Sequence, residues 1–525
     1  MSTIICRRLT FGYDGSAFNL FSDLDLTIDT NWRCGLTGAN GRGKTTLLKL
    51  LDRQLSPAKG DVEYSGSTRY FPRPVRNQSV SAFTAAKISA GPYYQLEEEM
   101  QRHLTKGDEA SLTLFSEVQE RYRQLGGYEV DALLSKELLR LGISEDQYSQ
   151  PFEQLSGGEQ SRCLLASLFL QNNSFALIDE PTNHLDYEGR ELVANYLKSK
   201  KGFLLVSHDR TFLDNCIDHV VALNSESVEV QRSSFTTWRT QHHQKLARQS
   251  AQNLELKKEI RSLSAAASER RVGSSKRESA KSGALDKGFE GSRAARQMKR
   301  ALNIEKRANQ KIEDRRATQH DVEKHYEIKF PSRSHGSYQL AKVDRLSILR
   351  PNPLFNSVSF TINPGTRLAI RGKNGSGKTS LLDLLSGTTL EHSGTVSFAR
   401  KPKISRSYQR PLWQEGSLLS KLEDAELDPS LFRTILATMG VKGGLLDQPI
   451  ENLSLGQQKK IDLARTLVEP SDLIIWDEPL NYIDIDTREQ IELAILRDSP
   501  TMIIVEHDEA FVRSIATDTI ELEAP

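Results

Sequence analysis

Apolar and polar residues alternate over residues 4–28, and this period of two predicts β-strands near the start of the chain. The leucines within 47–51 predict a helix that ends near residues 56–57, and residues 60–64 have the pattern of an antiparallel strand. Over 93–145, leucines at helical spacing alternate with charged residues, which predicts a helical subdomain.

Short, uninterrupted apolar runs at 175–178 and 203–206 predict buried strands. The second half of the chain repeats such runs at 368–370, 473–475 and 503–505. The order of predicted elements is therefore duplicated along the chain.

Between the two repeats, residues 234–270 and 292–328 each predict a helix of about 35 residues, roughly 50 Å long. Each carries one narrow apolar stripe, which favours an antiparallel hairpin. The stripes consist of Leu256, Ile260 and Leu263 in the first helix and Ala301, Ile304, Ala308 and Ile312 in the second. Residues 271–291 are rich in Gly, Ser, Lys and Arg and predict a mobile loop at the hairpin tip.

The length and composition of the chain restrict its class. A chain of 525 residues is too long for one core and predicts two to four domains. No apolar run approaches the roughly 18 to 20 residues that span a bilayer, and residues 1–8 lack the apolar core of a signal peptide, so we expect a cytoplasmic protein. The spacing of the four cysteines indicates neither a disulfide framework nor a zinc site.

The charge is distributed unevenly although the net charge is only +1. Residues 241–330 contain 22 Lys and Arg against 12 Asp and Glu, whereas the rest of the chain contains 48 against 57. A basic segment between two acidic halves indicates a contact with nucleic acid, and a solvated pair of Lys/Arg-rich helices is the alternative.

Two glycine-rich stretches, 36–46 and 372–380, follow apolar strands and precede helices. Their glycines allow backbone N–H groups to converge on phosphate oxygens. Lys44 places a positive charge on the β- and γ-phosphates, and the hydroxyl of Thr45 can ligate Mg²⁺. The pattern alone is moderately specific, but its repetition predicts two nucleotide sites.

Three further motifs follow each glycine-rich stretch. Residues 155–160 read LSGGEQ, a turn that begins a helix with Ser156 as N-cap, and the apolar strand 175–178 then delivers Asp179 and Glu180. Asp179 can hold Mg²⁺, and Glu180 can polarise an attacking water. A second strand ends at His208.

The second half repeats this order with Ser454, Asp477, Glu478 and His507. The serine precedes the aspartate by 23 residues in both halves, and the histidine follows the aspartate by 29 and 30 residues. From lysine to signature serine the first half has 112 residues and the second 76, so we place 36 additional residues in the helical subdomain of the first half.

In this order, and present twice, these motifs resemble the ATP-binding-cassette superfamily. The resemblance implies an α/β fold with two P-loop cassettes, at 1–232 and 332–525, joined by the helical-hairpin linker 233–331. It also implies a Mg²⁺-dependent ATPase in which each ATP lies between the phosphate loop of one cassette and the signature of the other.

The resemblance assigns the site residues as follows. The catalytic residues are Glu180, Glu478, His208 and His507, and the Mg²⁺ ligands are Thr45, Asp179, Thr379 and Asp477. The ATP-binding residues are Tyr13, Gly38, Asn40, Gly41, Arg42, Gly43, Lys44, Thr45, Thr46, Ser156, Gly157, Gly158, Gly372, Asn374, Gly375, Ser376, Gly377, Lys378, Thr379, Ser380, Gln409, Ser454, Gly456 and Gln457. The ring of Tyr13 can stack on the nucleobase, and its burial in the sheet is the alternative.

Two cassettes in one chain, a long charged linker and no transmembrane segment resemble the ABC-F branch, whose members act on the ribosome. Within that branch, residues 181–186, 286–289, 455–460 and 476–484 look most like antibiotic-resistance proteins of the Lsa/Vga kind. The resemblance implies a protein that is monomeric off the ribosome and binds the exit site, large-subunit rRNA and P-site tRNA. It would relieve inhibition by lincosamides, pleuromutilins and streptogramin A drugs.

Three positions depart from the superfamily pattern. Arg73 stands where a glutamine is usual, whereas the second half has Gln409. Leu455 replaces a signature glycine, and Leu349 or Arg350 stands where the second half would carry a stacking aromatic. These differences favour two unequal sites.

The linker tip carries the residues that we expect to contact RNA. Phe289 can stack on a base, with closure of the hairpin's own apolar end as the alternative, and the cations contact phosphates without reading sequence. These cations are Lys276, Arg277, Lys281, Lys287, Arg293, Arg296, Lys299 and Arg300.

Other functions fit parts of the pattern. A housekeeping ABC-F translation factor would share every motif named above. The ATPase subunit of an exporter has no evident use for a basic hairpin of about 90 residues, and DNA-repair ATPases typically carry coiled coils of hundreds of residues. No membrane partner is expected.

Overall fold

The computed structural model describes residues 2–13, 15, 19–170, 174–183, 185–224, 227–279, 328, 330, 339–441, 444 and 448–525. The chain divides into two compact units. One unit contains Met1–Thr236 and Tyr326–Pro525, which are termed the first half and the second half below, and the other contains Thr237–His325.

The first half begins with an antiparallel sheet in the order β2-β1-β4, as the alternating pattern predicted. Its inward side chains, such as Ile4, Leu9 and Ile28, are almost fully buried. The strands are β1 (Thr3–Phe11), β2 (Phe21–Asp29) and β4 (Lys59–Glu63).

A second sheet of six described strands has the order β5-β6-β7-β3-β8-β9. It is parallel except for the β8–β9 pair. The central strands β6 and β7 are almost entirely buried apolar runs, as expected for parallel strands that are covered on both faces. The strands are β3 (Arg33–Thr37), β5 (Ser67–Phe71), β6 (Ser174–Asp179), β7 (Phe203–Val206), β8 (His219–Leu223) and β9 (Val228–Arg232).

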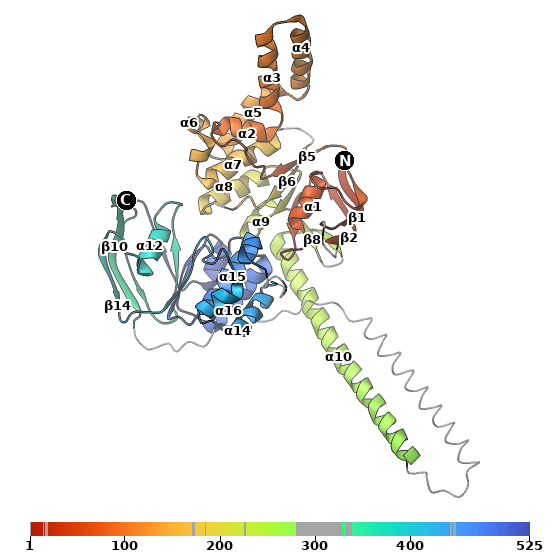
Figure 1. Cartoon of the computed structure of the whole chain (residues 1–525), viewed down its shortest axis with the longest axis vertical. Coiled ribbons are helices and arrows are strands. Elements are labelled where there is room, and N and C mark those ends of the chain that lie inside the picture. Colours follow the sequence, from red (N-terminus) through yellow and green to blue (C-terminus); the bar gives the residue numbers. More distant parts are fainter. Residues whose placement is uncertain are drawn as a thin grey trace, which may run out of the picture. The chain divides into compact units, whose positions relative to one another are not determined.

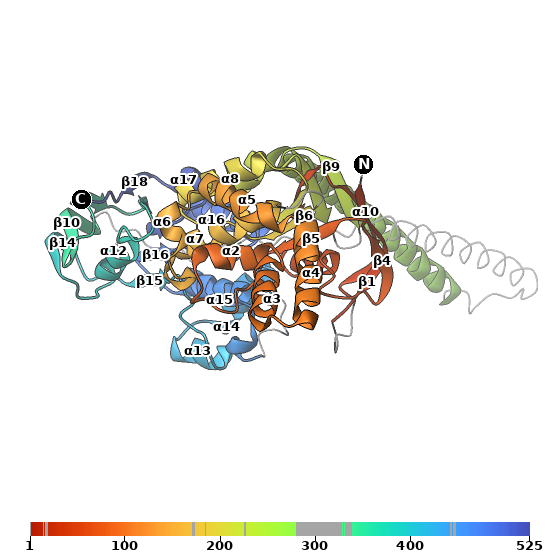
Figure 2. The same cartoon turned by 90° about the horizontal axis from the view of Figure 1, so that it is seen from above.

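Helix α1 (Lys44–Leu51) follows the first glycine-rich stretch and ends earlier than the predicted 56–57. The other helices of the first half follow β5 in the chain, and Figures 1 and 2 show α2 to α7 grouped together. They are α2 (Ala82–Ala90), α3 (Tyr93–Lys106), α4 (Glu109–Gln124), α5 (Gly127–Arg140), α6 (Glu145–Tyr148), η1 (Phe152–Gln154), α7 (Gly157–Ala166), η2 (Ser167–Phe169), α8 (Tyr187–Lys198) and α9 (Arg210–Cys216).

The second half repeats the plan. Strands β15-β16-β17-β13-β18 form a parallel sheet whose order matches β5-β6-β7-β3-β8, and β10, β11, β12 and β14 form the antiparallel sheet. The strands are β10 (Ala341–Arg350), β11 (Asn352–Pro353), β12 (Val358–Ile362), β13 (Arg367–Arg371), β14 (His392–Phe398), β15 (Ile404–Ser407), β16 (Leu473–Asp477), β17 (Met502–Val505) and β18 (Asp518–Glu521).

The helical subdomains differ in size. Between β5 and α7 the first half has five α-helices, whereas the described residues between β15 and α15 contain only α13 and α14. The additional length of the first half therefore lies in its helical subdomain, as the spacing predicted. The helices of the second half are α12 (Lys378–Leu385), α13 (Leu418–Asp424), α14 (Pro429–Thr438), η4 (Ile450–Asn452), α15 (Leu455–Val468), α16 (Ile485–Asp498) and α17 (Glu509–Ile515).

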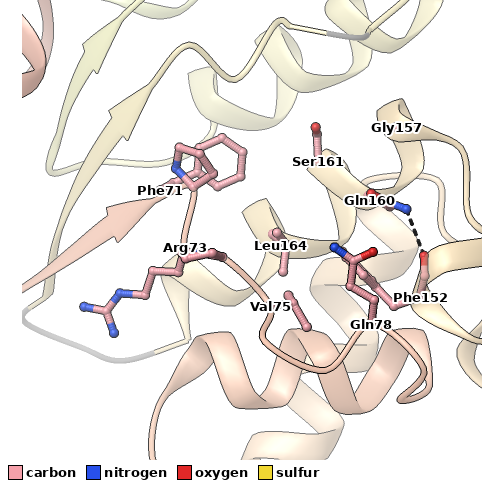
Figure 3. Close-up of a pocket in the computed structure, with 11 residues that line it drawn as sticks. Phe71, Arg73, Val75, Gln78, Phe152, Gly157, Gln160, Ser161 and Leu164 are labelled. Atoms are coloured by element: carbon pink, nitrogen blue, oxygen red, sulfur yellow. Dashed lines mark hydrogen bonds between the residues drawn. The ribbon is translucent and has the colours of Figure 1, made fainter. Parts of the chain in front are cut away.

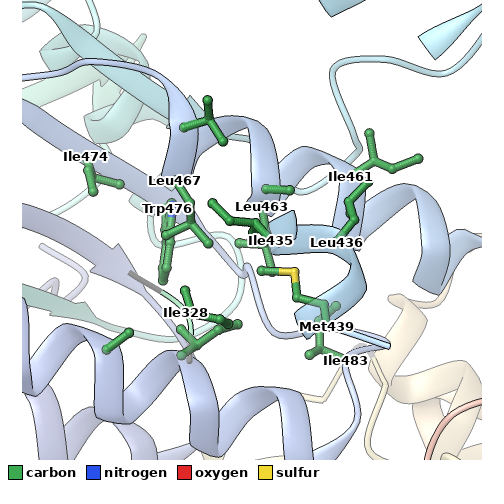
Figure 4. Packing of buried hydrophobic residues seen from close by; sticks show 14 of the residues in the cluster. Ile328, Ile435, Leu436, Met439, Ile461, Leu463, Leu467, Ile474, Trp476 and Ile483 are labelled. Atoms are coloured by element: carbon green, nitrogen blue, oxygen red, sulfur yellow. The ribbon is translucent and has the colours of Figure 1, made fainter. Parts of the chain in front are cut away.

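An extensive apolar core lies between the helices and the parallel sheet of the second half (Figure 4). Trp476 of β16 is fully buried there, beside Leu463 and Leu467 of α15. Its indole N–H donates to Thr466 Oγ1 at 3.0 Å, so the polar edge of the ring is satisfied. The core holds β16, and with it the residues that follow Trp476, in a fixed position.

Helix α10 (Phe235–Ser279) confirms the first linker helix and extends it beyond the predicted end at residue 270. The prediction of a loop is therefore wrong for residues 271–279, which are helical. One glycine, Gly273, costs a helix only about 1 kcal/mol, and the surrounding Ser, Arg, Lys and Glu tolerate helical geometry. The remainder of the predicted tip and helix 292–327 lie outside the described residues.

Candidate functional site: two duplicated phosphate loops

Each glycine-rich stretch joins a central strand to a helix, as predicted. The first runs from β3 to α1 and the second from β13 to α12. Gly43 and Gly377 precede the helices with φ of 89° and 90°, a region that favours glycine. A Cβ on Gly43 would lie 2.6 Å from Phe21 Cζ, so a side chain does not fit there without rearrangement.

The two loop lysines are buried and lie over their own loops. Lys44 Nζ donates to Gly38 O at 2.7 Å, and Lys378 Nζ donates to the carbonyls of Gly372 and Lys373, both at 2.8 Å. Burial lowers the pKa of both ammonium groups, while nearby carboxylates, among them Glu180 and Glu478, raise it. The helix N-termini and these cations together form anion-binding cradles.

The strands β6 and β16 end at Asp179 and Asp477. Burial raises the pKa of Asp179 and raises that of Asp477 to about 6, whereas the neighbouring hydroxyls of Thr45 and Thr379 act in the opposite direction. Both carboxylate oxygens of Asp477 are buried without a hydrogen-bond partner of normal geometry among the described residues.

A divalent cation fits this donor set. Buried carboxylate oxygens and a threonine hydroxyl are oxygen ligands of the kind that Mg²⁺ takes. In the first half, one carboxylate oxygen of the aspartate is less available to a metal ion, because Asp179 Oδ2 accepts a hydrogen bond from the Tyr70 hydroxyl at 3.2 Å.

Glu180 and Glu478 follow the two aspartates and have the same unusual backbone. Both have φ of 49°, which non-glycine residues seldom adopt and which typically persists only where the surrounding structure enforces it. Each glutamate faces the predicted histidine: His208 Nε2 lies 3.4 Å from Glu180 Oε1, and His507 Nε2 lies 3.5 Å from Glu478 Oε1. The structure therefore brings each predicted glutamate–histidine pair together.

The surroundings of the two glutamates differ. Gln409 Nε2 donates to Glu478 Oε1 at 3.0 Å, and Asn481 Nδ2 donates to Glu478 Oε2 at 2.8 Å. Among the described residues, Glu180 Oε1 is buried without a hydrogen-bond partner of normal geometry, although His208 Nε2 lies 3.4 Å away.

The pKa values follow this difference. Burial, reinforced by the neighbouring Asp179, raises the pKa of Glu180 to about 8. Burial also opposes ionisation of Glu478, but hydrogen bonds from His507 and Asn481 and the charge of Lys378 lower its pKa to about 2.

Arg73 occupies the position that corresponds to Gln409. Phe71 pairs with Ile178 and Ser407 with Trp476, in each case one residue before the aspartate, so Arg73 and Gln409 are equivalent in register. The side chain of Arg73 is directed toward Asp52 instead, with Nη2 3.5 Å from Oδ2. The two equivalent residues therefore have different partners: Arg73 contacts Asp52, whereas Gln409 contacts Glu478.

Both signature serines are N-caps, which confirms the prediction for Ser156. Ser156 Oγ and Ser454 Oγ each accept the backbone N–H three residues on, both at 3.3 Å, and each helix start has a capping box with Glu159 or Gln457. Gly157 and Gly158 open α7, whereas α15 begins with Leu455 and Gly456. The side chain of Leu455 is exposed.

Contacts between the two halves lie near both loops. Asn40 Nδ2 donates to Tyr482 O at 3.3 Å, and Lys373 Nζ lies 3.0 Å from Glu188 Oε2. A cavity of about 210 Å³ is lined by Tyr187 and Glu188 of the first half and by residues of the second half that include Lys378 and His507. Among the described residues, neither signature serine takes part in these contacts between the halves. The binding of ATP by Ser156 and Ser454 from the opposite half therefore stays a prediction.

Tyr13 is exposed and its hydroxyl lies 2.9 Å from Thr46 Oγ1. Its burial in the sheet, the alternative interpretation, is therefore wrong. Of the predicted tip cations, Lys276 and Arg277 fall within α10 rather than a loop. Lys281, Lys287, Phe289, Arg293, Arg296, Lys299 and Arg300 lie outside the described residues.

Sequence reasoning missed Asn481 and Tyr70, which contact Glu478 and Asp179. An asparagine follows the glutamate by three residues in both halves: Asn183 after Glu180 and Asn481 after Glu478. That repeated amide beside a predicted general base was a usable signal. Nothing local to Tyr70 indicated its contact.

Comparison with known proteins agrees with this geometry. The sequence family described as "ABC transporter" matches residues 21–183 and 355–481, together more than half of the chain. YdiF of Bacillus subtilis (strain 168), described as an ATP-binding protein, is 26% identical over 98% of this chain and 79% of its own length. "ABC transporter F family member 5" of Arabidopsis thaliana is 26% identical over 96% of this chain and 73% of its own length.

Solved structures show the same fold. A crystal structure of the complex of archaeal ribosomal stalk protein aP1 with the archaeal ribosome recycling factor aABCE1 matches with a TM-score of 0.60 and 19% identity, over 99% of this chain and 88% of that chain. "RNase-L Inhibitor" matches with a TM-score of 0.59 and 19% identity, over 99% of this chain and 88% of that chain.

None of the described helices combines the length and apolar character needed to cross a lipid bilayer. The fold is mixed α/β with two P-loop cassettes. The family match implies ATP binding and ATPase activity. With the family matched in both halves around the two phosphate loops, this chain belongs to the ABC transporter family of ATP-binding proteins.

Proposed function

We propose that this protein is an ABC-F ATPase that binds the ribosome and protects it from antibiotics acting at the peptidyl-transferase centre. The observation that carries the proposal is the long helix α10, part of a segment with an excess of Lys and Arg, placed between two duplicated ATP-binding halves. An F-family relative and a structural neighbour whose title names a ribosomal stalk protein and a ribosome recycling factor support a ribosomal target.

In this proposal, residues 1–232 and 332–525 form the cassettes and 233–331 form the linker. Two ATP molecules favour the closed arrangement of the cassettes, and docking on the ribosome requires that arrangement. The linker then enters from the exit site toward the peptidyl-transferase centre and contacts rRNA and P-site tRNA. The protein is cytoplasmic and monomeric off the ribosome.

The roles of the site residues follow from their chemistry. Lys44 and Lys378 bind the β- and γ-phosphates, and Glu180 and Glu478 orient and deprotonate the attacking water. Thr45 with Asp179, and Thr379 with Asp477, would hold Mg²⁺, which supplies charge neutralisation on the phosphates. The backbone N–H groups of the signature helices stabilise the γ-phosphate from the opposite half.

We predict that Tyr13→Ala raises the Kd for ATP at the first site by about tenfold, because a base stacked on an aromatic ring gains roughly 1–3 kcal/mol. Tyr13→Phe should retain the affinity, since it keeps the ring and loses only the contact with Thr46. Binding of a fluorescent ATP analogue, with Lys378→Ala present to silence the second site, measures the change. Equal losses for both variants would contradict stacking.

The function is tested by sedimentation with ribosomes. Glu180→Gln with Glu478→Gln should bind ATP without hydrolysing it, so the variant is expected to pellet with ribosomes in ATP and to remain in the supernatant in ADP. Replacing residues 280–291 with a short Gly/Ser loop shows whether the tip contributes affinity or acts after docking. Failure to pellet with any nucleotide would exclude the ribosomal target.

Drug protection is tested separately by expressing the wild-type protein in a susceptible bacterium. Raised tolerance to a lincosamide or pleuromutilin, lost in Glu180→Gln/Glu478→Gln, is the expected result. Ribosome binding without altered tolerance would favour a housekeeping translation factor.

A further inference from the structure

The two halves differ in how the segment after strand β5 or β15 is attached to the signature helix. In the second half, Lys459 of α15 is fully buried, and its ammonium donates to the carbonyl oxygens of Tyr408 and Gln409, the latter at 3.3 Å. Gln409 in turn donates to Glu478. One lysine therefore joins the signature helix to the segment whose amide contacts the predicted general base.

Two further side chains of α15 strengthen this attachment. Asp462 Oδ2 accepts from Ser407 Oγ at 2.6 Å, and Arg465 pairs with Asp462 at 3.0 Å. Arg465 also donates to the carbonyl oxygen of Arg406. Buried charges are costly unless they are paired and hydrogen-bonded, so a cluster of this kind is maintained by its mutual contacts.

The first half lacks each of these groups. Counted from the signature serine, Ser161 stands in place of Lys459, Leu164 in place of Asp462, and Ser167 in place of Arg465. The hydroxyl of Ser167 bonds to Ser89 and to Leu164 O, within the helical subdomain.

A cavity of about 300 Å³ is lined in the first half by Ser161, the residue that stands in place of Lys459 (Figure 3). Ser161 and Leu164 of α7 line it on one side, and Phe71, Arg73 and Val75 line it on the other. Figure 3 shows the guanidinium of Arg73 directed away from these side chains. Among the described residues of the first half, Ser161 makes no contact like that of Lys459, and the cavity lies beside it instead.

We propose that Lys459 is a positioning residue that connects signature helix α15 to Glu478 through Gln409, and that the first half has no equivalent connection. The inference rests on the proposed function, in which Ser454 and Gly456 at the start of α15 close on the ATP of the first loop. Binding at the first site then orders the glutamate that serves the second site. Because this coupling acts on kcat, it need not be reciprocal.

The test is steady-state ATP turnover of the full-length protein. Lys459→Met keeps the length of the side chain and removes its donors, and it is expected to lower kcat about tenfold, less than the loss of a general base costs. The KM should change less than twofold. Lys459→Arg restores donors and should recover most of the rate, which a purely structural loss would not.

A double-variant comparison separates positioning from general damage. In the Glu478→Gln background, Lys459→Met should cause no further loss, because both changes act through the same glutamate. Ser161→Met is the matched control in the first half, where the cavity accommodates the side chain, and it should leave kcat unchanged. If Lys459→Met does not fold, Gln409→Ala serves as the alternative variant, because the side chain of Gln409 is exposed. It should lower kcat by a similar factor.

Independent, multiplicative losses from Lys459→Met and Glu478→Gln would overturn the inference, as would an equal loss from Ser161→Met. A wild-type protein without ATPase activity would instead contradict the proposed function. The two failures are therefore distinguishable.

Discussion

Glu478→Gln is expected to remove most ATP turnover, lowering kcat about 100-fold or more, whereas Glu180→Gln lowers it by less than about tenfold. The physical reason is preorganisation. Both oxygens of Glu478 are held by amide donors, from Gln409 and Asn481, and His507 lies 3.5 Å away. Glu180 has His208 at 3.4 Å, and the arginine that replaces the glutamine is directed elsewhere.

The measurement is phosphate release at saturating ATP for each single variant, together with the Kd for ATP. The affinity for ATP should change little in either variant, because the carboxylates contribute to the reaction of water rather than to phosphate binding. Asn481→Ala should lower kcat in the same direction as Glu478→Gln but by less. Equal rates for the two single glutamate variants would show that both halves hydrolyse ATP alike.

Much of the fold could be predicted because it depends on local pattern. Continuous apolar runs predicted the buried strands, and the residues around Ser156 predicted that it is an N-cap, which its capping hydrogen bond confirms. Duplicated spacing predicted that the extra residues of the first half form helices. Each of these features is determined by residues close together in the chain, so it can be recognised from the sequence.

The error and the omission have different causes. Helix α10 continues through Gly273 because a single glycine weakens a helix without ending it. The contact of Lys459 with the segment after β15 joins residues about 50 positions apart, and no periodicity reports it. Only a comparison of the two halves could have indicated this contact, because α15 has Lys459 at the position where α7 has Ser161.

The largest expected loss of stability comes from Arg488→Ala. The guanidinium of Arg488 pairs with Asp508 at 3.0 Å, both side chains are buried, and it also donates to the carbonyl oxygens of Leu480 and Ile483. Removing the arginine leaves a buried carboxylate and two buried carbonyls without these partners, which costs about 3–5 kcal/mol of unfolding free energy. The same arrangement joins Arg190 to Asp209 in the first half.

Urea unfolding followed by tryptophan fluorescence measures this cost in the second half alone. In a Trp32→Phe/Trp238→Phe background the remaining tryptophans, Trp413 and Trp476, both lie in the second half. Arg488→Ala is expected to lower the midpoint by about 2 M urea, given a slope of roughly 2 kcal/mol per M. Arg513→Ala removes an exposed pair with Glu509 and should shift the midpoint by less than about 0.5 M, because surface ion pairs contribute little. Similar shifts for both variants would mean that the Arg488–Asp508 pair does not hold α16 against α17.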